Sequence, residues 1–143
     1  MNIVIRDMKI EDADSVHRLT GELGYLLTLE QTKNFIETIG SLQDNIALVA
    51  LYADTVVGWV HAFKAHRIET TPFVEIAGLV VDSNYRGHGI GKMLVDRIRK
   101  WGHQKEVDTL RLRTNTKRLE AHRFYERLGF VNTKDQKIYE MKL

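Results

Sequence analysis

The sequence predicts a mixed α/β domain spanning residues 1–143, with helices packed on a central sheet. Runs rich in β-branched apolar residues are interspersed with segments whose apolar residues recur every three to four positions. A glycine-rich turn joins an apolar run at 76–81 to a helical pattern at 89–103. The length, with 43% hydrophobic and 28% charged residues, suits one soluble domain with a core of its own.

The first half is predicted to contain a strand, two helices and two strands. The strand at 3–6 precedes a helix at 11–23 that is acidic in its first turns, where carboxylates complement the helix dipole. Thr28 and Gln31 have the spacing of a capping box and begin a second helix, which ends at Gly40. Two predicted strands flank a tight turn: a mostly apolar run at 46–51 and a run rich in β-branched and aromatic residues at 55–63.

The second half is predicted to contain strands and helices in alternation, followed by a hairpin. In order, these are a strand at 73–81, a helix at 89–103, a strand at 109–113, a helix at 118–128 and hairpin strands at 130–133 and 138–141. Gly129 is the expected C-terminal glycine of the last helix. The order β-α-α-β-β-β-α-β-α-β-β gives about seven strands and about four helices.

The glycine-rich turn has the features of an anion site. Backbone N–H groups are free at the start of a helix, glycine lets a ligand approach them closely, and the helix dipole adds positive potential. Arg86 and Lys92 flank the turn with two more charges. The dinucleotide fingerprint fails because Lys92 stands where its third glycine is needed. The P-loop fails because Arg86 replaces its first glycine and Met93 its Ser or Thr.

Two motifs and the order of the elements resemble one family. Arg86-x-x-Gly89-x-Gly91 resembles the R/Q-x-x-G-x-G/A signature of the GNAT superfamily of acyl-CoA N-acyltransferases. Further along, the chain resembles the family's second segment, with the residues Ala121-x-x-Phe124-Tyr125-Glu126-x-x-Gly129-Phe130. The resemblance spans the chain and implies the GNAT fold, with a central, mostly antiparallel mixed sheet. It also implies N-acetyltransferase activity with acetyl-CoA as acyl donor.

The resemblance implies which residues bind coenzyme A. The pyrophosphate is expected on the turn, at Arg86, Gly87, His88, Gly89, Ile90, Gly91 and Lys92. The pantetheine arm is expected to pair with the strand before the turn, at Leu79, Val80 and Val81, with the N–H of Val80 facing the thioester oxygen. Asn115 either bonds the pantetheine amide or the helix start, or serves as a turn asparagine.

The resemblance also implies the catalytic groups. Tyr125 is the candidate general acid for the leaving thiolate, the alternative being a tyrosine that only packs its helix. Glu75 is the candidate general base acting through water, the alternative being a solvated or ion-paired carboxylate, and the sequence does not fix which side of the sheet it faces. Without cysteine no acetyl-cysteine intermediate can form, so the amine is expected to attack directly. The six histidines have no metal-ligand spacing, and no metal is expected.

The charge distribution bears on the partners. Residues 1–82 carry 6 Lys and Arg against 12 Asp and Glu, whereas residues 83–127 carry 12 against 5. The basic part suits an anionic cofactor, and the acidic part suits a small cationic amine. The resemblance implies that the first two helices and their loop shape the acceptor site. Residues 21–40 are therefore expected to form an apolar pocket with an acidic rim, which also fits a protein or peptide amine.

The composition bears on three other points: nucleic-acid binding, membrane association and cellular location. A non-catalytic module that binds acyl-CoA or nucleic acid is the alternative, but aromatic residues are not interleaved with the basic ones, so no nucleic acid is expected. No apolar stretch approaches the ~20 residues of a membrane span, and the N-terminus lacks a signal-peptide pattern, so no membrane partner and a cytoplasmic location are expected. The resemblance also allows a homodimer.

Overall fold

The computed structural model describes residues 1–143, which divide into two compact units, Met1–Leu112 and Arg113–Leu143. The strands of the first unit are β1 (Ile3–Asp7), β2 (Asn45–Tyr52), β3 (Thr55–Ala65), β4 (Phe73–Val81) and β5 (Leu110–Leu112). Its α-helices are α1 (Ala13–Glu22), α2 (Leu29–Ser41) and α3 (Ile90–Gln104), and its 3₁₀ turns are η1 (Ile10–Asp12) and η2 (Ser83–Tyr85). The second unit contains α4 (Leu119–Arg127). No helix is both long and apolar enough to cross a membrane.

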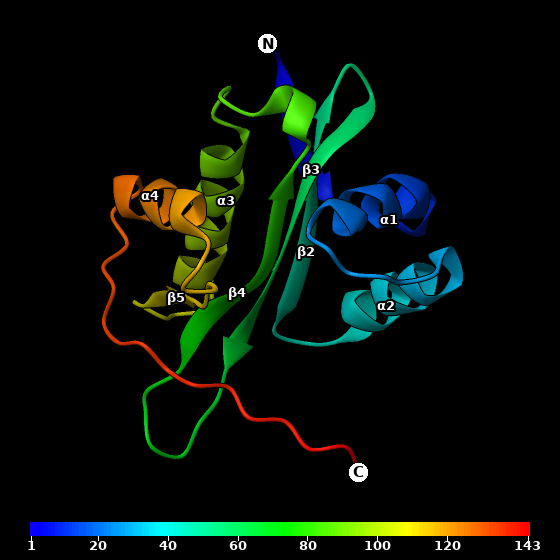
Figure 1. Cartoon of the computed structure of the whole chain (residues 1–143). Helices are drawn as coiled ribbons and strands as arrows, with labels where there is room; N and C mark the ends of the chain where they lie inside the picture. Colours follow the sequence, from blue (N-terminus) through cyan, green and yellow to red (C-terminus); the bar gives the residue numbers. More distant parts are fainter. The chain divides into compact units, whose positions relative to one another are not determined.

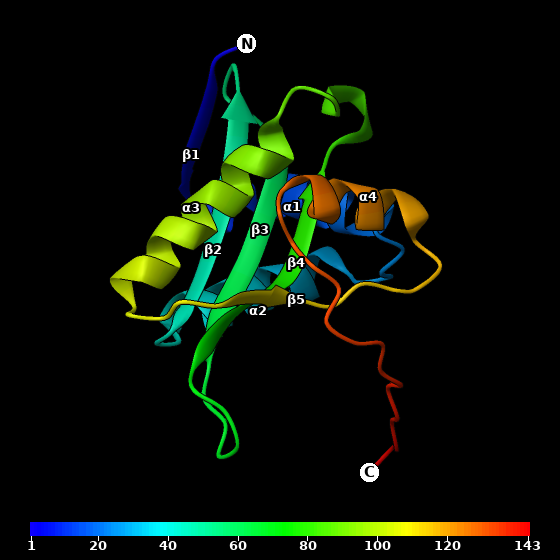
Figure 2. The same ribbon diagram turned by 90° about the vertical axis from the view of Figure 1, so that its left-hand side faces the viewer.

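The first unit is a sheet between two helical layers. Its strand order is β1-β2-β3-β4-β5, with antiparallel pairing throughout except for the parallel pair β4–β5. Helices α1 and α2 lie on one face and α3 lies on the other, as Figures 1 and 2 show. The predicted mixed, mostly antiparallel sheet and the four α-helices are confirmed.

Apolar side chains pack on both faces of the sheet. On the α1 side, Val16 and Leu19 pack with a buried group on the strands, comprising Val49, Val56 and Val80. On the other side, α3 buries Ile90, Leu94 and Ile98, which are 0–1% exposed. Each such side chain contributes about 1.5–3 kcal/mol by leaving water. A Cβ at Gly58 would lie 3.0 Å from Val80 O and 3.5 Å from Leu94 Cδ1, so glycine lets α3 approach β3 closely.

The helix starts follow local hydrogen bonding. The predicted capping box is present, since Gln31 N donates to Thr28 Oγ1 and Thr28 N donates to Gln31 Oε1. Helix α1 begins at Ala13, later than predicted, because Asp12 is buried and accepts hydrogen bonds from Arg6 and from Lys9 N. These contacts hold residues 10–12 in a 3₁₀ turn.

The C-terminal hairpin predicted at 130–133 and 138–141 is absent, so the sheet has five strands instead of seven. The apolar side chains of this segment are exposed, including Val131 at 80% and Ile138 at 74%. A two-stranded hairpin is marginal in water unless its apolar face is covered, and the connection at 134–137 has no glycine to favour a tight turn. Gly129 is confirmed as the glycine after α4, with φ of 101° and its N–H on Glu126 O.

Candidate active site

The turn between β4 and α3 presents free backbone N–H groups. Gly87 and Gly89 have φ of 83° and 78°, the left-handed region in which a side chain is strained. A Cβ at either glycine would meet no atom within 4 Å, so backbone conformation, not crowding, requires glycine there. Gly89 is the N-cap of α3 and offers no side-chain cap to the N–H groups that follow. An anion can therefore occupy the start of this 15-residue helix.

The two cations that flank the turn differ in their contacts. Arg86 lies against the turn, where its Nε donates to Val81 O at 3.3 Å. Lys92 Nζ is 2.8 Å from Asp96 Oδ2, one helical turn along α3, and this ion pair offsets its charge. His88 is exposed in the turn. Arg86 is thus the basic side chain most available to an anion at the turn.

The outer edge of β4 is open next to the turn. Strand β5 pairs with β4 only at Val74, Ile76 and the residue between them, so 77–81 have a strand neighbour on the β3 side alone. A parallel ladder that ends so early leaves backbone donors and acceptors of β4 without strand partners. An extended ligand can pair there as an additional strand.

The hydrogen bonds of β4 decide which residues its open edge offers. Asp82 N donates to Val57 O of β3 at 2.8 Å, and Val80 O also points toward β3, at 3.0 Å from the position of a Cβ on Gly58. The backbone groups of successive strand residues point to opposite sides, so those of Val80 belong to the β3 ladder. The open edge therefore offers Leu79 and Val81, which corrects the expectation that the N–H of Val80 faces a thioester. The Val80 side chain is buried against α1.

A β-bulge sets the face on which Glu75 lies. His61 pairs with Gly78 and Ala62 pairs with Ile76, so Ala77 is an extra residue of β4 with no partner. Val80 faces α1, and alternation across the bulge places Gly78 and Glu75 on this same face. Without the extra residue, Glu75 and Val80 would lie on opposite faces of the sheet.

Aromatic and polar side chains of β3 accompany Glu75 on this face. The Trp59 indole covers Gly78, where a Cβ would lie 2.9 Å from Trp59 Cη2. His61 Nε2 is 2.9 Å from Asn45 Oδ1, and burial lowers the pKa of this histidine. Sequence reasoning missed these residues. The available signal was Gly78 itself, because a glycine inside a strand often marks a bulge or a close approach.

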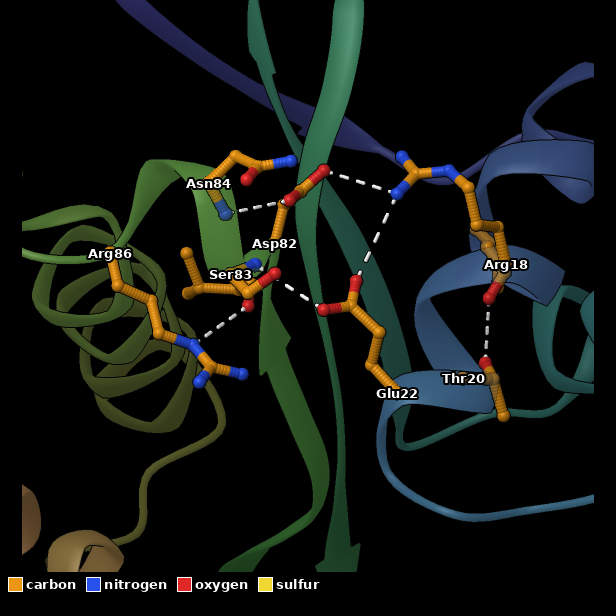
Figure 3. Close-up of polar contacts among 9 residues, drawn as sticks. Arg18, Thr20, Glu22, Asp82, Ser83, Asn84 and Arg86 are labelled. Carbon is orange, nitrogen blue, oxygen red and sulfur yellow. Dashed lines mark hydrogen bonds and ion pairs between the residues drawn. The ribbon is translucent and has the colours of Figure 1, made fainter.

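The turn is tied to helix α1 by ionic contacts, shown in Figure 3. Arg18 Nη1 lies 3.1 Å from Asp82 Oδ2 and 3.8 Å from Glu22 Oε2. Glu22 Oε1 accepts a hydrogen bond from Ser83 N at 3.3 Å. These contacts join α1 to the first residues of the turn.

The predicted acceptor region presents an exposed surface. In the loop between α1 and α2, Tyr25 is 63% exposed and Leu26 is 98% exposed. Leu27 O is 2.7 Å from His17 Nε2, which fixes the end of the loop on α1. A cavity of about 530 Å³ lies elsewhere, lined by Thr71, Pro72, His103, Glu106, Val107 and Asp108. It is next to the C-terminal end of α3, away from the turn that precedes that helix.

The second unit carries the remaining predicted residues. The Tyr125 ring packs edge-on against Phe124 and Phe130, with centroids 5.1 and 5.7 Å away. Burial raises the pKa of its hydroxyl, and Arg118 offsets part of this rise. Asn115 forms a turn before α4, accepting from Lys117 N at Oδ1, so its side chain makes the local contact named as an alternative in the sequence analysis.

Known proteins with similar sequences are acetyltransferases. The sequence pattern of the acetyltransferase (GNAT) family matches residues 15–130. The aminoalkylphosphonate N-acetyltransferase of Salmonella typhimurium is 32% identical over 130 residues, covering 88% of this chain and 83% of that protein. The N-acetylaspartate synthetase of Xenopus tropicalis is 37% identical over 82 residues, which are 57% of this chain and only 29% of the longer protein.

Solved structures match the whole fold. An aminoglycoside N-acetyltransferase, AAC(6')-Iy, in complex with CoA has a TM-score of 0.90 at 19% identity, covering 99% of this chain and 96% of that one. Glucosamine-6-phosphate N-acetyltransferase from Arabidopsis thaliana has a TM-score of 0.85 at 21% identity, covering 99% and 100%. These likenesses confirm the predicted fold. Together with the family pattern over residues 15–130, they show that the chain belongs to the acetyltransferase (GNAT) family.

Proposed function

We propose that this chain moves the acetyl group of acetyl-CoA to the primary amine of a small cationic acceptor by direct attack. One observation carries the proposal: the open edge of β4 at 77–81 leads into a glycine turn at the start of α3. An extended pantetheine arm ending in a pyrophosphate has the shape and charge to use both features at once. The CoA complex of AAC(6')-Iy supports the choice of cofactor.

The geometry of the turn and the strand supports the proposed binding roles. The N–H groups of the turn, from Gly87 to Lys92, hold the pyrophosphate, and Arg86 adds a charge-assisted contact. The backbone groups of Leu79 and Val81 pair with the pantetheine amides, and one N–H of this edge donates to the thioester oxygen. Such a donor stabilises negative charge that develops on that oxygen during attack.

The chemical step needs a base and an acid. The amine nitrogen attacks the thioester carbon and the carbon–sulfur bond breaks. Glu75 accepts the proton of the amine through water, and Tyr125 donates its proton to the departing thiolate. Glu75 lies on the same face of the sheet as α1, the helix that leads into the 23–28 loop. This placement supports a base that faces the acceptor.

Glu75→Gln tests the base. Because glutamine cannot accept the proton, kcat is expected to fall by about 10²-fold or more and the acidic limb of the kcat/KM profile to disappear. The measurement is a pH series at saturating acetyl-CoA. Glu69→Gln, in the exposed loop before β4, is the matched control and should keep the wild-type profile. An acidic limb that survives in Glu75→Gln would assign the base to another group.

Acceptor charge is tested by ionic strength. Glu22 and Glu30 stand on either side of the exposed loop, so a cationic amine is expected to be attracted to this end of the molecule. For such an amine, kcat/KM should fall by about tenfold as salt screens the attraction, while a neutral amine should lose much less. Both are measured at the same saturating acetyl-CoA concentration. Equal salt dependence of the two acceptors would reject steering by these carboxylates.

The overall activity is tested by thiol release from acetyl-CoA with a panel of amines. The panel contains an aminoglycoside, an aminoalkylphosphonate, aspartate and a peptide with a free N-terminus. Release that depends on one of these amines supports transfer and identifies the acceptor class. CoA binding without release for any amine would favour the non-catalytic module, and absence of CoA binding would overturn both functions.

A further inference from the structure

We propose that Arg18, Glu22 and Asp82 are positioning residues that couple the acceptor-side loop at 23–28 to the cofactor turn. The inference rests on the proposed function, since it assumes that the turn binds CoA. Arg18 and Glu22 belong to α1 and not to the turn. They therefore act on the cofactor through the turn backbone that they hold in place.

Asp82 fixes the start of the turn by four contacts. Its N–H donates to Val57 O at 2.8 Å, and its carbonyl accepts from Tyr85 N at 2.9 Å. Its Oδ1 accepts from Asn84 N at 2.9 Å, while its Oδ2 faces Arg18 Nη1 at 3.1 Å. The residue is 5% exposed, so these contacts take the place of water around its carboxylate. Removing Arg18 leaves a buried charge beside the turn and favours its rearrangement.

Glu22 makes a second connection from the same helix. It stands one helical turn after Arg18, and its Oε1 accepts from Ser83 N at 3.3 Å. Its other oxygen, Oε2, is 3.8 Å from Arg18 Nη1, so the guanidinium lies between two carboxylates. Figure 3 shows both carboxylates directed at Arg18 from opposite sides of the gap between α1 and the turn. The turn is therefore held at residues 82, 83 and 84 by a single network.

The same helix holds the loop on its other side. His17 precedes Arg18 and lies 2.7 Å from Leu27 O, at the end of the loop. Glu22 is the last residue of α1 and leads directly into the loop. Helix α1 thus fixes both ends of the 23–28 segment and the first residues of the turn. A ligand that orders one side makes ordering of the other less costly, which is positive coupling between the two sites.

The chain offers a matched control for the loss of Arg18. Arg6 donates from two nitrogens to Asp12 at 2.8 and 2.9 Å, and Asp12 is 6% exposed, close to the 5% of Asp82. Arg6→Ala therefore leaves an equally buried carboxylate without its arginine, but at the other end of α1. A change seen in Arg18→Ala and not in Arg6→Ala reports on the turn and not on general loss of stability.

The experiment has two measurements. Calorimetry gives the CoA dissociation constant, and amide hydrogen exchange with and without CoA gives the protection of each segment. In the wild-type chain, CoA is expected to protect amides of the turn at 87–91 and of the loop at 23–28. In Arg18→Ala, the CoA dissociation constant should rise about three- to tenfold. At CoA concentrations that saturate each variant, protection of the turn should remain while protection of the loop is lost. Arg18→Lys should restore part of both effects, and Arg6→Ala should behave as wild type.

A second variant guards against misfolding of Arg18→Ala. Glu22→Ala removes only the contact with Ser83 N and one carboxylate beside Arg18, and it should also reduce loop protection. Coupling is overturned if CoA binds the wild type and loop protection is equal in wild type, Arg18→Ala and Glu22→Ala, a result that leaves the proposed function standing. Failure of the wild type to bind CoA overturns the proposed function and the coupling together.

Discussion

Tyr125→Phe is expected to lower kcat by about 10²–10⁴-fold, the loss typical of a missing general acid. The departing thiolate needs a proton at neutral pH. Burial raises the pKa of the Tyr125 hydroxyl above its ordinary value, so the hydroxyl stays protonated at neutral pH, as the proposed general acid requires. Affinity for acetyl-CoA should stay nearly constant, because the lost contact matters mainly in the transition state.

The stability of the variant should change little. Phenylalanine keeps the ring and with it the edge-on packing against Phe124 and Phe130. Tyr139→Phe is the matched control, since that tyrosine is in the same unit and 84% exposed. Thermal unfolding of the three proteins separates a loss of packing from a loss of the hydroxyl.

Single-turnover kinetics measure the chemical step directly. The defect of Tyr125→Phe should shrink with an acyl donor whose thiol is more acidic, because that leaving group needs less proton donation. Wild-type turnover in a chemistry-limited assay would show that Tyr125 is not the acid. Parallel loss of binding and turnover would assign it a packing or positioning role.

Arg86→Glu is expected to weaken acetyl-CoA binding by about 100-fold. The substitution removes a charge-assisted contact, worth about 1.5–3 kcal/mol, and places a carboxylate beside the pyrophosphate. The loss should diminish at high salt, since the side chain is exposed and its interaction with the anion is screened. Calorimetry over a range of salt concentrations measures both effects.

The matched control is Lys100→Glu, which makes the same change of charge at an exposed position of α3 far from its N-terminus. It should reduce affinity only slightly. Equal losses in the two variants would mean that net charge alone attracts the cofactor. Unchanged affinity in Arg86→Glu would remove the turn from the binding site.

Features decided by near neighbours in the sequence were predictable. The capping box of Thr28 and Gln31, the apolar face of α3 and Gly129 after α4 all depend on residues within one or two helical turns. The succession of strands and helices up to α4 also followed from the apolar patterns, and it agrees with the order of elements in the family. The C-terminal hairpin failed for the opposite reason. Its strands depend on a covering partner, which local propensity does not supply.

The sequence predicts where the candidate site lies, but not which backbone groups of β4 open onto it. The turn and the strand before it were identified from the glycines and the apolar run. Which β4 residues open to the outer edge depends on hydrogen bonds with β3, and these assign Leu79 and Val81 in place of Val80. The pairing of Asp82 with Arg18 joins residues 64 positions apart, which no local pattern encodes.

The bulge in β4 also bears on how this sequence can vary. Ala77 has an exposed side chain, so its identity matters little to the core. Deleting it would instead shift the alternation of every earlier residue of the strand, turning Glu75 toward α3 and carrying Val74 and Ile76 out of their buried positions. The fold at this point of the strand therefore depends on the number of residues more than on the kind of residue at position 77.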